Sequence, residues 1–500
     1  MESTTIAAVS TPPGVGGIAV IRLSGPRALE IADKVWKGKS LKNATSHTAH
    51  LGDIITPDGE VADQAVATIF HKGKSFTGED TVEFSIHGSK WIQREVMALL
   101  IDAGAAPAAP GEFTKRAFIN GRIDLAQAES IADTISAESR AAHRIATSAM
   151  KGELSRRLDG IRNDLITLAS LLELELDFSE EDVEFADRNR LNELSDRTIS
   201  DINRLRASFR KGKAIKDGIP TVIAGIPNAG KSTLLNALIE DEKAIVSDIP
   251  GTTRDTIEDT AEIGDILFRF IDTAGLRDTE DTIEQIGVER AKTQLANASL
   301  VLWLIDPTTD KDPQLSLLQT LLPTLPAETT ILPIITKKDL QPTPTAEILN
   351  DNSKTSLSKI EISTGKDLMI LPKIEISDGK DLMIPSKIEI SDGKDLMILP
   401  VIEISAKTGT GIDRLKATLT EIATPEQADT TIITNLRHYQ ALTATSEALH
   451  RVKEGLTTDL SPALIAQDLR EAIHHLGTIT GAITTDTLLQ TIFSTFCIGK

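Results

Sequence analysis

The sequence has a single cysteine, Cys497, so no disulfide can form within the chain. Such scarcity is typical of proteins in a reducing compartment and predicts a cytoplasmic protein. Aromatic residues are also scarce, at 3% of 500 residues, so aliphatic side chains must fill the cores. No stretch approaches the roughly 18 uninterrupted apolar residues of a membrane span, and the N-terminus lacks the pattern of a signal peptide. We therefore expect no membrane association.

The chain is short of positive charge. It has 53 Lys and Arg against 73 Asp and Glu, which gives a formal net charge of −20. A protein this acidic is poorly suited to hold nucleic acid over one broad phosphate-neutralising face. Any action on RNA therefore needs a local basic patch or a basic partner. The length itself predicts two or three domains.

The first 215 residues divide into two parts. Residues 1–119 contain short β-type runs such as Gly17–Leu23, Val61–Phe70 and Thr81–Ile86, which indicate a small α+β N-terminal domain. Residues 120–215 instead carry apolar side chains at helical spacing, which predicts long amphipathic helices.

The rest of the chain returns to helices after a different segment. Residues 216–424 alternate apolar strands with helical stretches, the pattern of an α/β domain with a parallel sheet. Residues 425–500 are helical again. The simplest architecture is an α/β domain inserted between two halves of one all-α helical domain.

A tandem repeat interrupts the α/β segment. Residues 359–372 read KIEISTGKDLMILP, residues 373–386 and 387–400 repeat this almost unchanged, and a divergent fourth copy starts at Val401. The Asp-Gly pairs of the second and third copies are hairpin-turn signals. We interpret residues 359–400 as a duplicated strand end that forms a surface excursion, because the entropy cost of a loop grows slowly with its length. A functional repeat array is the alternative.

A phosphate-binding motif opens the α/β segment. An apolar strand leads into Gly225-x-x-x-x-Gly230-Lys231-Ser232, and a helical stretch follows. Glycines allow backbone N–H groups to surround phosphates, the lysine reaches the β- and γ-phosphates, and the Ser232 hydroxyl can bind Mg²⁺. The motif and its strand–loop–helix context predict a P-loop nucleotide-binding domain.

Further motifs follow in the order typical of GTPases. Thr253, in the loop Gly251–Asp255, can complete the magnesium shell, and Asp272-Thr273-Ala274-Gly275 ends an apolar strand where it can hold the metal sphere through water and sense the γ-phosphate. Asp339 follows another strand and can accept hydrogen bonds from the guanine N1–H and amine, which adenine does not offer. Ser405-Ala406-Lys407 can meet the base carbonyl. Together these motifs predict GTP as the substrate.

Two details of the base-binding motifs stand out. The position of Thr336 usually holds Asn, which braces the phosphate loop, so we expect weaker affinity with specificity intact. Each repeat copy also contains Ser-(Thr/Asp)-Gly-Lys, close to the base-contacting loop. From Asp339 to Ser405 is 66 positions, and removal of three 14-residue copies leaves about 24, an ordinary strand–helix–strand spacing. The fourth copy is therefore the one expected to contact the base.

The complete set of motifs resembles the MnmE (TrmE) family of tRNA modification GTPases. In the α/β segment the resemblance lies in GIPNAGKST, GTTRD, DTAGLR and IEQIGVERA. In the N-terminal part it lies in STPPGVGGIAVIRLSG, SFTGEDTVEFSIHG and PGEFTKRAFINGRIDLAQAE, and the chain ends in FCIGK. The resemblance spans nearly the whole chain except residues 359–400.

The resemblance implies a function and its participants. Proteins of this family use GTP and, with the flavoprotein MnmG, install an aminomethyl-type group, such as carboxymethylaminomethyl, at the wobble uridine of tRNA. Their one-carbon unit comes from a 5-formyl- or methylene-tetrahydrofolate bound to the N-terminal domain, which also forms the homodimer. A heterotetramer with MnmG, and potassium and magnesium ions at the GTP site, are implied as well.

The resemblance also implies roles for individual residues. Asn228, Ser247, Ile249 and Thr252 match the potassium-binding positions, and Glu284 matches the acidic residue that orients the attacking water. Without the resemblance, Glu284 would be interpreted as a solvated helix carboxylate. The predicted GTP contacts comprise Asn228, Ala229, Gly230, Lys231, Ser232, Thr233, Ser247, Asp248, Ile249, Pro250, Gly251, Thr252, Thr253, Asp272, Thr273, Ala274, Gly275, Thr336, Lys337, Asp339, Ser405, Ala406 and Lys407.

Four residues match the folate-contacting positions of the family: Arg22, Glu83, Arg122 and Lys500. A carboxylate such as Glu83 can pair with the donor edge of a pterin, and arginines suit an anionic tail. Lys500 is the last residue, so the C-terminus must return to the N-terminal domain of the same or the partner subunit. Two other readings stay open, a ribosome-assembly GTPase and a purely regulatory GTPase whose N-terminal domain only docks a partner.

Overall fold

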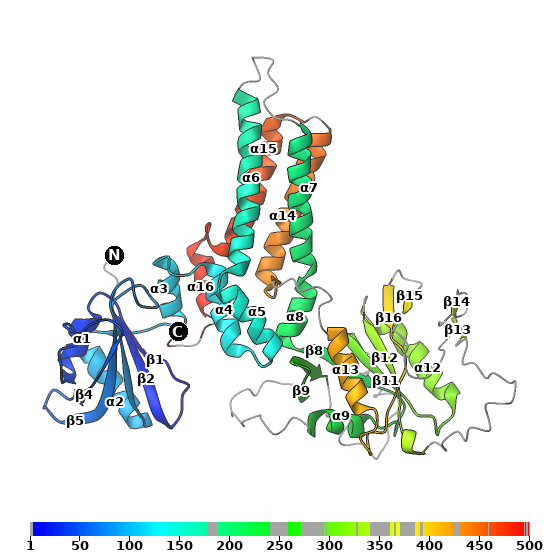
Figure 1. Ribbon diagram of the computed structural model, residues 1–500, viewed down its shortest axis with the longest axis horizontal. Helices are drawn as coiled ribbons and strands as arrows, with labels where there is room; N and C mark the ends of the chain where they lie inside the picture. The colour runs from blue at the N-terminus through cyan, green and yellow to red at the C-terminus, as the bar shows by residue number, and fades with distance from the viewer. Residues whose placement is uncertain are drawn as a thin grey trace. The chain divides into compact units, whose positions relative to one another are not determined.

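The computed structural model describes residues 4–177, 188–240, 259–271, 295–296, 298–326, 329–340, 361–364, 367–370, 386–390, 394–423, 431–458, 460–494, 496 and 499. The chain forms two compact units (Figure 1). One comprises Met1–Ser136, Arg144–Phe209 and Thr430–Lys500, and the other comprises Ala137–His143 and Arg210–Asp429. The predicted classes of fold, an α+β N-terminal domain, a helical domain and an inserted α/β domain, are confirmed.

The N-terminal domain is built on a seven-stranded sheet in the order β3-β4-β5-β6-β2-β1-β7. Its central strands are long and antiparallel, and their side chains alternate between a buried and a more exposed face. The strands are β1 (Ile6–Val9), β2 (Gly16–Ser24), β3 (Trp36–Lys37), β4 (Thr48–Ile55), β5 (Val61–Phe70), β6 (Thr81–Gly88) and β7 (Ala106–Pro107).

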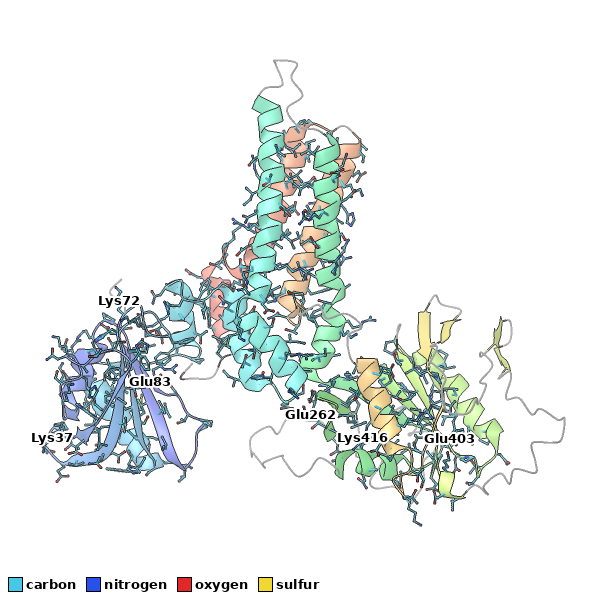
Figure 2. All side chains as sticks on the ribbon, viewed as in Figure 1. Lys37, Lys72, Glu83, Glu262, Glu403 and Lys416 are labelled. Atoms are coloured by element: carbon cyan, nitrogen blue, oxygen red, sulfur yellow. The ribbon has the colours of Figure 1, made fainter. Side chains whose placement is uncertain are left out.

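Two helices, α1 (Ala28–Lys34) and α2 (Lys90–Asp102), cover one face of this sheet. The Ser89 side chain begins α2 by accepting a hydrogen bond from the Trp91 backbone N–H. Apolar residues of the helices then pack on Ile21, Phe84 and other buried residues of the strands. The opposite sides of β2 and β6 are left available for polar side chains, among them Glu83 (Figure 2).

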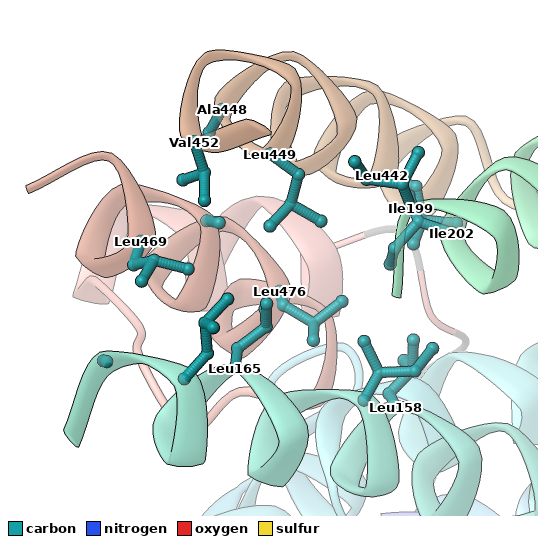
Figure 3. Close-up of a cluster of buried hydrophobic side chains, with 14 of the residues drawn as sticks. Leu158, Leu165, Ile199, Ile202, Leu442, Ala448, Leu449, Val452, Leu469 and Leu476 are labelled. Carbon is teal, nitrogen blue, oxygen red and sulfur yellow. The ribbon is translucent and has the colours of Figure 1, made fainter. Parts of the chain in front are cut away.

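Four long helices form the body of the helical domain: α6 (Glu153–Asp177), α7 (Arg188–Ala207), α14 (Leu436–Thr457) and α15 (Pro462–Thr480). Figure 3 shows aliphatic side chains from all four meeting in one core. Leu165, Ile202, Leu449 and Leu469 are all fully buried. Aliphatic packing therefore joins segments before and after the α/β insertion. Shorter helices complete the unit: α3 (Glu112–Ile119), α4 (Leu125–Ser136), α16 (Asp486–Ser494) and the part of α5 (Arg140–Met150) that begins at Arg144.

A buried ion cluster also links the two halves of the helical domain. Glu129 of α4 accepts hydrogen bonds from Arg437 and lies 2.7 Å from His438 Nε2, both at the start of α14. Burial alone would raise the pKa of Glu129, but the charge and hydrogen bond of His438, with those of Arg437, bring it to about 2. The cluster fixes α14 against α4.

The α/β domain contains a sheet in the order β15-β16-β12-β11-β8-β10-β9, with β17 also beside β12. β8, β11 and β12 are parallel, as are β10 with β8 and β17 with β12, so their carboxyl ends meet at one edge. The strands are β8 (Ile219–Ala224), β9 (Asp259–Ile263), β10 (Ile266–Phe270), β11 (Leu300–Ile305), β12 (Thr330–Ile335) and β17 (Ile402–Glu403). The helical elements are α8 (Phe209–Asp217), α9 (Lys231–Glu240), α12 (Lys311–Leu321), α13 (Ile412–Ala423) and the short turns η1 (Leu322–Thr324) and η2 (Lys338–Leu340).

The repeat segment forms hairpins. The first copy pairs β13 (Glu361–Thr364) with β14 (Asp367–Ile370). At the third copy, β15 (Ser386–Ile390) pairs with β16 (Lys394–Ile398), and β16 also joins the edge of β12 through Met397 and Ile398. The hairpin predicted for the third copy is thus confirmed, and that predicted for the second lies outside the described residues. The repeat segment is predicted to be a surface excursion, and β16 within it also adds a strand to the sheet of the α/β domain.

Candidate functional site

The loop between β8 and α9 has the backbone geometry of a phosphate-binding loop. Gly230 has a φ of +97°, which a residue with a side chain rarely adopts. A Cβ added at Gly225 would lie 2.8 Å from the Leu304 carbonyl oxygen, so only glycine fits there. Asn228 also has a positive φ, +62°. The sequence pattern therefore specifies a tight turn whose N–H groups lead into the first turn of α9.

Lys231 lies at the start of α9 and folds back over this loop. Its Nζ donates to the carbonyl oxygens of Gly225, at 3.0 Å, and Ile226, at 2.9 Å. Burial lowers the pKa of Lys231, because desolvation disfavours the charged form. An incoming phosphate would supply the negative charge that these neutral carbonyl groups lack.

The candidate base-binding residues come together at the carboxyl ends of β12 and β17. Ser405 Oγ donates to Asp339 Oδ1 at 2.6 Å, and Lys338 N donates to the Ile404 carbonyl at 3.1 Å. The Ser405 hydrogen bond lowers the pKa of Asp339, more than burial raises it. Asp339 is thus kept ionised, as an acceptor of two guanine N–H groups must be. Figure 2 labels Glu403, whose carboxylate pairs with Lys338 Nζ at 2.7 Å beside this loop.

The structure gives Thr336 a different contact from the one that Asn makes in other GTPases. Its hydroxyl donates to the Ile305 carbonyl oxygen at 3.3 Å, and its side chain is buried. The hydroxyl therefore joins the base loop to β11 and not to the phosphate loop. Its effect on guanine affinity stays a prediction.

Geometry favours the fourth repeat copy as the base-contacting one. The loop after Ser405 closes through a hydrogen bond from Ser405 N to the Thr410 carbonyl. Gly411 has a φ of +79°, and a Cβ there would lie 2.3 Å from the Glu403 carbonyl oxygen. The equivalent position in each of the three earlier copies holds a methionine, Met369, Met383 or Met397. Those copies can form strands but cannot close this loop in the same way.

Many predicted contacts lie outside the described residues. These are Ser247, Asp248, Ile249, Pro250, Gly251, Thr252, Thr253, Asp272, Thr273, Ala274, Gly275 and Glu284. Their roles stay predictions. In the part of the chain that the structure describes, no group of three His, Cys, Asp or Glu side chains could hold a metal ion, and the predicted ligand Ser232 lies in the first turn of α9.

Arg22 and Glu83 form an ion pair on the N-terminal sheet. They face each other across β2 and β6, and Arg22 Nε donates to Glu83 Oε1 at 2.8 Å. The guanidinium carbon lies 5.8 Å from the centre of the Phe76 ring and 5.5 Å from that of Phe113. Both side chains keep roughly a quarter of their surface exposed, 21% and 27%. The pair is therefore oriented by aromatic neighbours but open to a ligand.

Two segments that are distant in sequence contact the same domain. Ser10, which follows β1, donates from Oγ to the Gly499 carbonyl at 3.0 Å, so the C-terminus returns to the N-terminal domain of its own chain. The Arg122 stem lies against Gly78, in the loop that also carries Phe76. Lys500 lies outside the described residues. Three of the four predicted folate contacts thus fall on or beside one region of the domain.

Comparisons with known proteins show which sequences this chain is similar to. The sequence profile of the MnmE helical domain matches residues 125–497, and that of the N-terminus of the GTP-binding protein TrmE matches residues 5–122. The tRNA modification GTPase MnmE of Parabacteroides distasonis is 45% identical over 99% of this chain and 100% of its own length. The chain belongs to the MnmE family of tRNA modification GTPases.

Other relatives give the same result. MnmE of Cytophaga hutchinsonii is 44% identical over 100% of this chain and 98% of its own length. Among solved structures, the G domain of the T. maritima FeoB iron transporter is 21% identical and covers 41% of this chain and 99% of its own, with a TM-score of 0.22, too low to support further comparison. This member of the MnmE family is accordingly a GTP hydrolase of tRNA modification.

Sequence reasoning missed two features of this MnmE-family chain. The Glu129–Arg437–His438 cluster joins residues more than 300 positions apart, and no local pattern signals it. The second is an ion pair between Asp306 and Lys337, which a polar residue directly after a buried strand could have suggested. Among the described residues, no helix has both the length and the apolar surface to cross a bilayer.

Proposed function

We propose that this chain is a potassium-dependent GTPase that, with a flavoprotein partner of the MnmG type, installs a carboxymethylaminomethyl-type group at the wobble uridine of tRNA. The observation that carries the GTP part is the hydrogen bond between Ser405 and Asp339, made at the carboxyl edge of the same parallel sheet that carries the Lys231 loop. Family membership carries the tRNA part. The proposed setting is a cytoplasmic homodimer that joins its partner in a heterotetramer.

The proposed chemistry at the GTP site is mostly electrostatic. Lys231 would hold the β- and γ-phosphates, Ser232 with Thr253 would hold Mg²⁺, and Asp339 would select guanine. Asn228, with residues 247–252, would hold K⁺, and the bound ion would supply positive charge to offset the negative charge that develops during hydrolysis. Glu284 would orient the attacking water. Asn228 fits this role in that its side chain comes from a left-handed turn inside the phosphate loop.

The N-terminal domain is proposed to bind a tetrahydrofolate. Glu83 offers a carboxylate to the pterin edge, and Arg22 and Arg122, with Lys500, offer positive charge to the carbonyl groups and the glutamate tail. The exposure of the Arg22–Glu83 pair and the hydrogen bond from Ser10, which follows β1 of the same sheet, to Gly499 support this assignment. A bound folate would supply the one-carbon unit, and the chain's own residues would orient it.

The central test is mass spectrometry of tRNA nucleosides from cells that lack the protein, with and without its return. We expect the wobble modification to disappear and to be restored by the wild-type gene. Restoration should fail with Lys231→Ala and with Glu284→Ala. An unchanged nucleoside profile in cells without the protein would contradict the proposal and favour a regulatory or ribosome-assembly role.

The ion dependence has its own test. GTP hydrolysis by the full chain should accelerate strongly in KCl and weakly in NaCl, because the smaller Na⁺ fits such a cage poorly. Asn228→Ala should remove most of the difference. Equal wild-type rates in the two salts, at matched ionic strength, would refute the potassium site and leave the guanine site untouched.

A further inference from the structure

Asp306 is a buried carboxylate at the edge of the sheet where GTPases bind nucleotide. It follows β11 directly, and β11 runs parallel to β12 with Ile305 opposite Ile335. Asp306 therefore lies beside Thr336, the first residue of the base loop. Only 1% of its surface is exposed. A buried carboxylate requires partners, because its desolvation is costly.

Asp306 is held rigidly by its neighbours. Its Oδ1 accepts hydrogen bonds from the Thr308 backbone N–H, at 2.9 Å, and from the Thr308 hydroxyl, at 2.7 Å. Its backbone N–H and carbonyl both bond to the Gln314 side chain, each at 2.9 Å. One carboxylate oxygen, Oδ2, is thus left to point at another element.

That oxygen accepts a hydrogen bond from Lys337 Nζ at 2.6 Å. Burial alone would raise the pKa of Asp306, but the hydrogen bonds from Lys337 and Thr308 hold it below its usual value. The carboxylate is therefore charged when it meets the ammonium group. The Lys337 side chain keeps 30% of its surface exposed, although its ammonium group is held by Asp306.

Lys337 has a conformation that requires support. Its φ is +55°, in the left-handed region that residues with side chains rarely adopt. The turn that follows is closed by a hydrogen bond from Leu340 N to the Lys337 carbonyl, at 2.9 Å. This turn carries Asp339. A shift of Lys337 would therefore move the carboxylate that is proposed to select guanine.

We propose that Asp306 is a positioning residue for guanine recognition. Its charge fixes the Lys337 ammonium, and through it the alkyl stem beside the base and the turn that presents Asp339. The Thr336 side chain joins the loop to β11 only through a hydroxyl bond to Ile305. Charge joins the loop to β11 through Asp306 and Lys337, and to β17 through Glu403 and Lys338. The inference rests on the proposed guanine site.

The test is a double-mutant cycle on the full chain, with the affinity for fluorescent GDP as the measurement. Asp306→Asn keeps the size and the Thr308 contacts but loses the charge, and should raise the Kd about 10-fold, or roughly 1.4 kcal/mol. Lys337→Met keeps an apolar stem but loses the ammonium, and should weaken binding similarly. The double variant should bind no worse than Lys337→Met alone.

Two controls separate this role from a structural one. Thr308→Ala removes a bond to Asp306 but leaves the ion pair, and should change the Kd less than twofold. Asp306→Glu keeps the charge, so its Kd should lie between those of wild type and Asp306→Asn. This variant keeps the test possible if Asp306→Asn does not fold. Additive effects of Asp306→Asn and Lys337→Met, or an unchanged Kd in Asp306→Asn, would overturn the proposal.

Failure of the underlying site has a different signature. If Asp339→Asn leaves guanine affinity unchanged while the cycle shows coupling, the proposed guanine contact is wrong and the ion pair acts elsewhere in the domain. If Asp339→Asn abolishes guanine binding while the cycle is additive, the site is right and Asp306 only caps its own turn.

Discussion

Asp339 and Glu83 are proposed to recognise the same chemical edge in two different ligands. Guanine and pterin both present a ring N–H beside an exocyclic amine, and a carboxylate can accept from both groups. Asp339 has a neutral partner, the Ser405 hydroxyl, whereas Glu83 is paired with the Arg22 guanidinium. The first arrangement keeps the full negative charge for the base. In the second arrangement, the positive charge of Arg22 balances the negative charge of Glu83, which suits a ligand with its own anionic tail.

The two carboxylates also differ in how the backbone presents them. Asp339 lies in the short turn η2, beyond the end of a parallel strand, and Glu83 lies within β6 of an antiparallel sheet. A turn can move when its supports are lost, whereas a residue inside a strand is fixed by its ladder. Loss of Asp306 or Lys337 should therefore act through the position of Asp339, whereas loss of Arg22 should act through the charge beside Glu83.

The largest expected effect is at Asp339. Asp339→Asn should weaken GDP binding about 1,000-fold, because the carboxamide is neutral, can accept only one of the two guanine hydrogen bonds, and turns its NH2 group toward the other donor. Xanthosine diphosphate, with a carbonyl in place of the amine, should then bind better than GDP. Calorimetry with both nucleotides measures the switch, and Asp413→Asn, an exposed carboxylate in the same domain, is the control. Equal GDP affinity in the variant and wild type would show that Asp339 does not bind guanine.

The corresponding change in the N-terminal domain is Glu83→Ala. We expect the affinity for 5-formyltetrahydrofolate to fall about 100-fold, because the ligand loses its charged acceptor and Arg22 loses its partner. GTP hydrolysis by the same protein should be unchanged. Calorimetry without nucleotide measures the loss, and Glu60→Ala provides an exposed carboxylate as a control. Folate binding equal to wild type would show that Glu83 serves only the sheet.

Arg22→Met tests whether a charged partner matters. Folate affinity should fall about 10-fold, since the positive charge is lost while the side chain can still pack between Phe76 and Phe113. Titration at several salt concentrations should show a weaker salt dependence than in wild type. A variant with wild-type affinity and salt dependence would mean that the guanidinium only stabilises the fold.

Ser405→Ala tests the neutral partner and should have the smallest effect, about three- to fivefold on GDP affinity, as expected for one uncharged hydrogen bond. The Ser405 bond lowers the pKa of Asp339, so its loss should raise that pKa toward the ordinary value. GDP binding requires the ionised carboxylate, and in the variant it should therefore begin to weaken at a higher pH as the pH falls. Parallel pH profiles of the two proteins would contradict this account.

The sequence predicted much of the nucleotide site because that site is built from local motifs. Gly230 and Lys231 lie at the end of the loop that follows β8, and Asp339 lies in the turn that follows β12. Parallel strands bring their carboxyl ends together. The choice of Ser405 among four similar segments followed from spacing alone, and Gly411 now gives it a steric reason. Predictions on residues 241–258 and 272–294 lie outside the described part of the chain.

Other features could not be predicted from local patterns. The ion pair of Asp306 and Lys337 depends on the register of β11 against β12, and the stacking of Arg22 on Phe113 depends on how α3 packs on the sheet. The sequence also gave no sign that the third repeat copy would join β12. Such contacts form by tertiary packing between segments that are far apart in sequence, and they leave no periodic pattern in the sequence.

The pairing of β16 with β12 has a consequence for how this gene can change. The strand sequence KDLMI of β16 also occurs at residues 366–370 and 380–384, and each time an IEIS segment follows within a few residues. Loss of one or two 14-residue units by recombination would therefore deliver the same strand to the same edge of the sheet. Gain of a unit would do likewise. A change in the number of repeat units would therefore leave a strand of this sequence next to β12, and the loop that follows Ser405 would be unchanged.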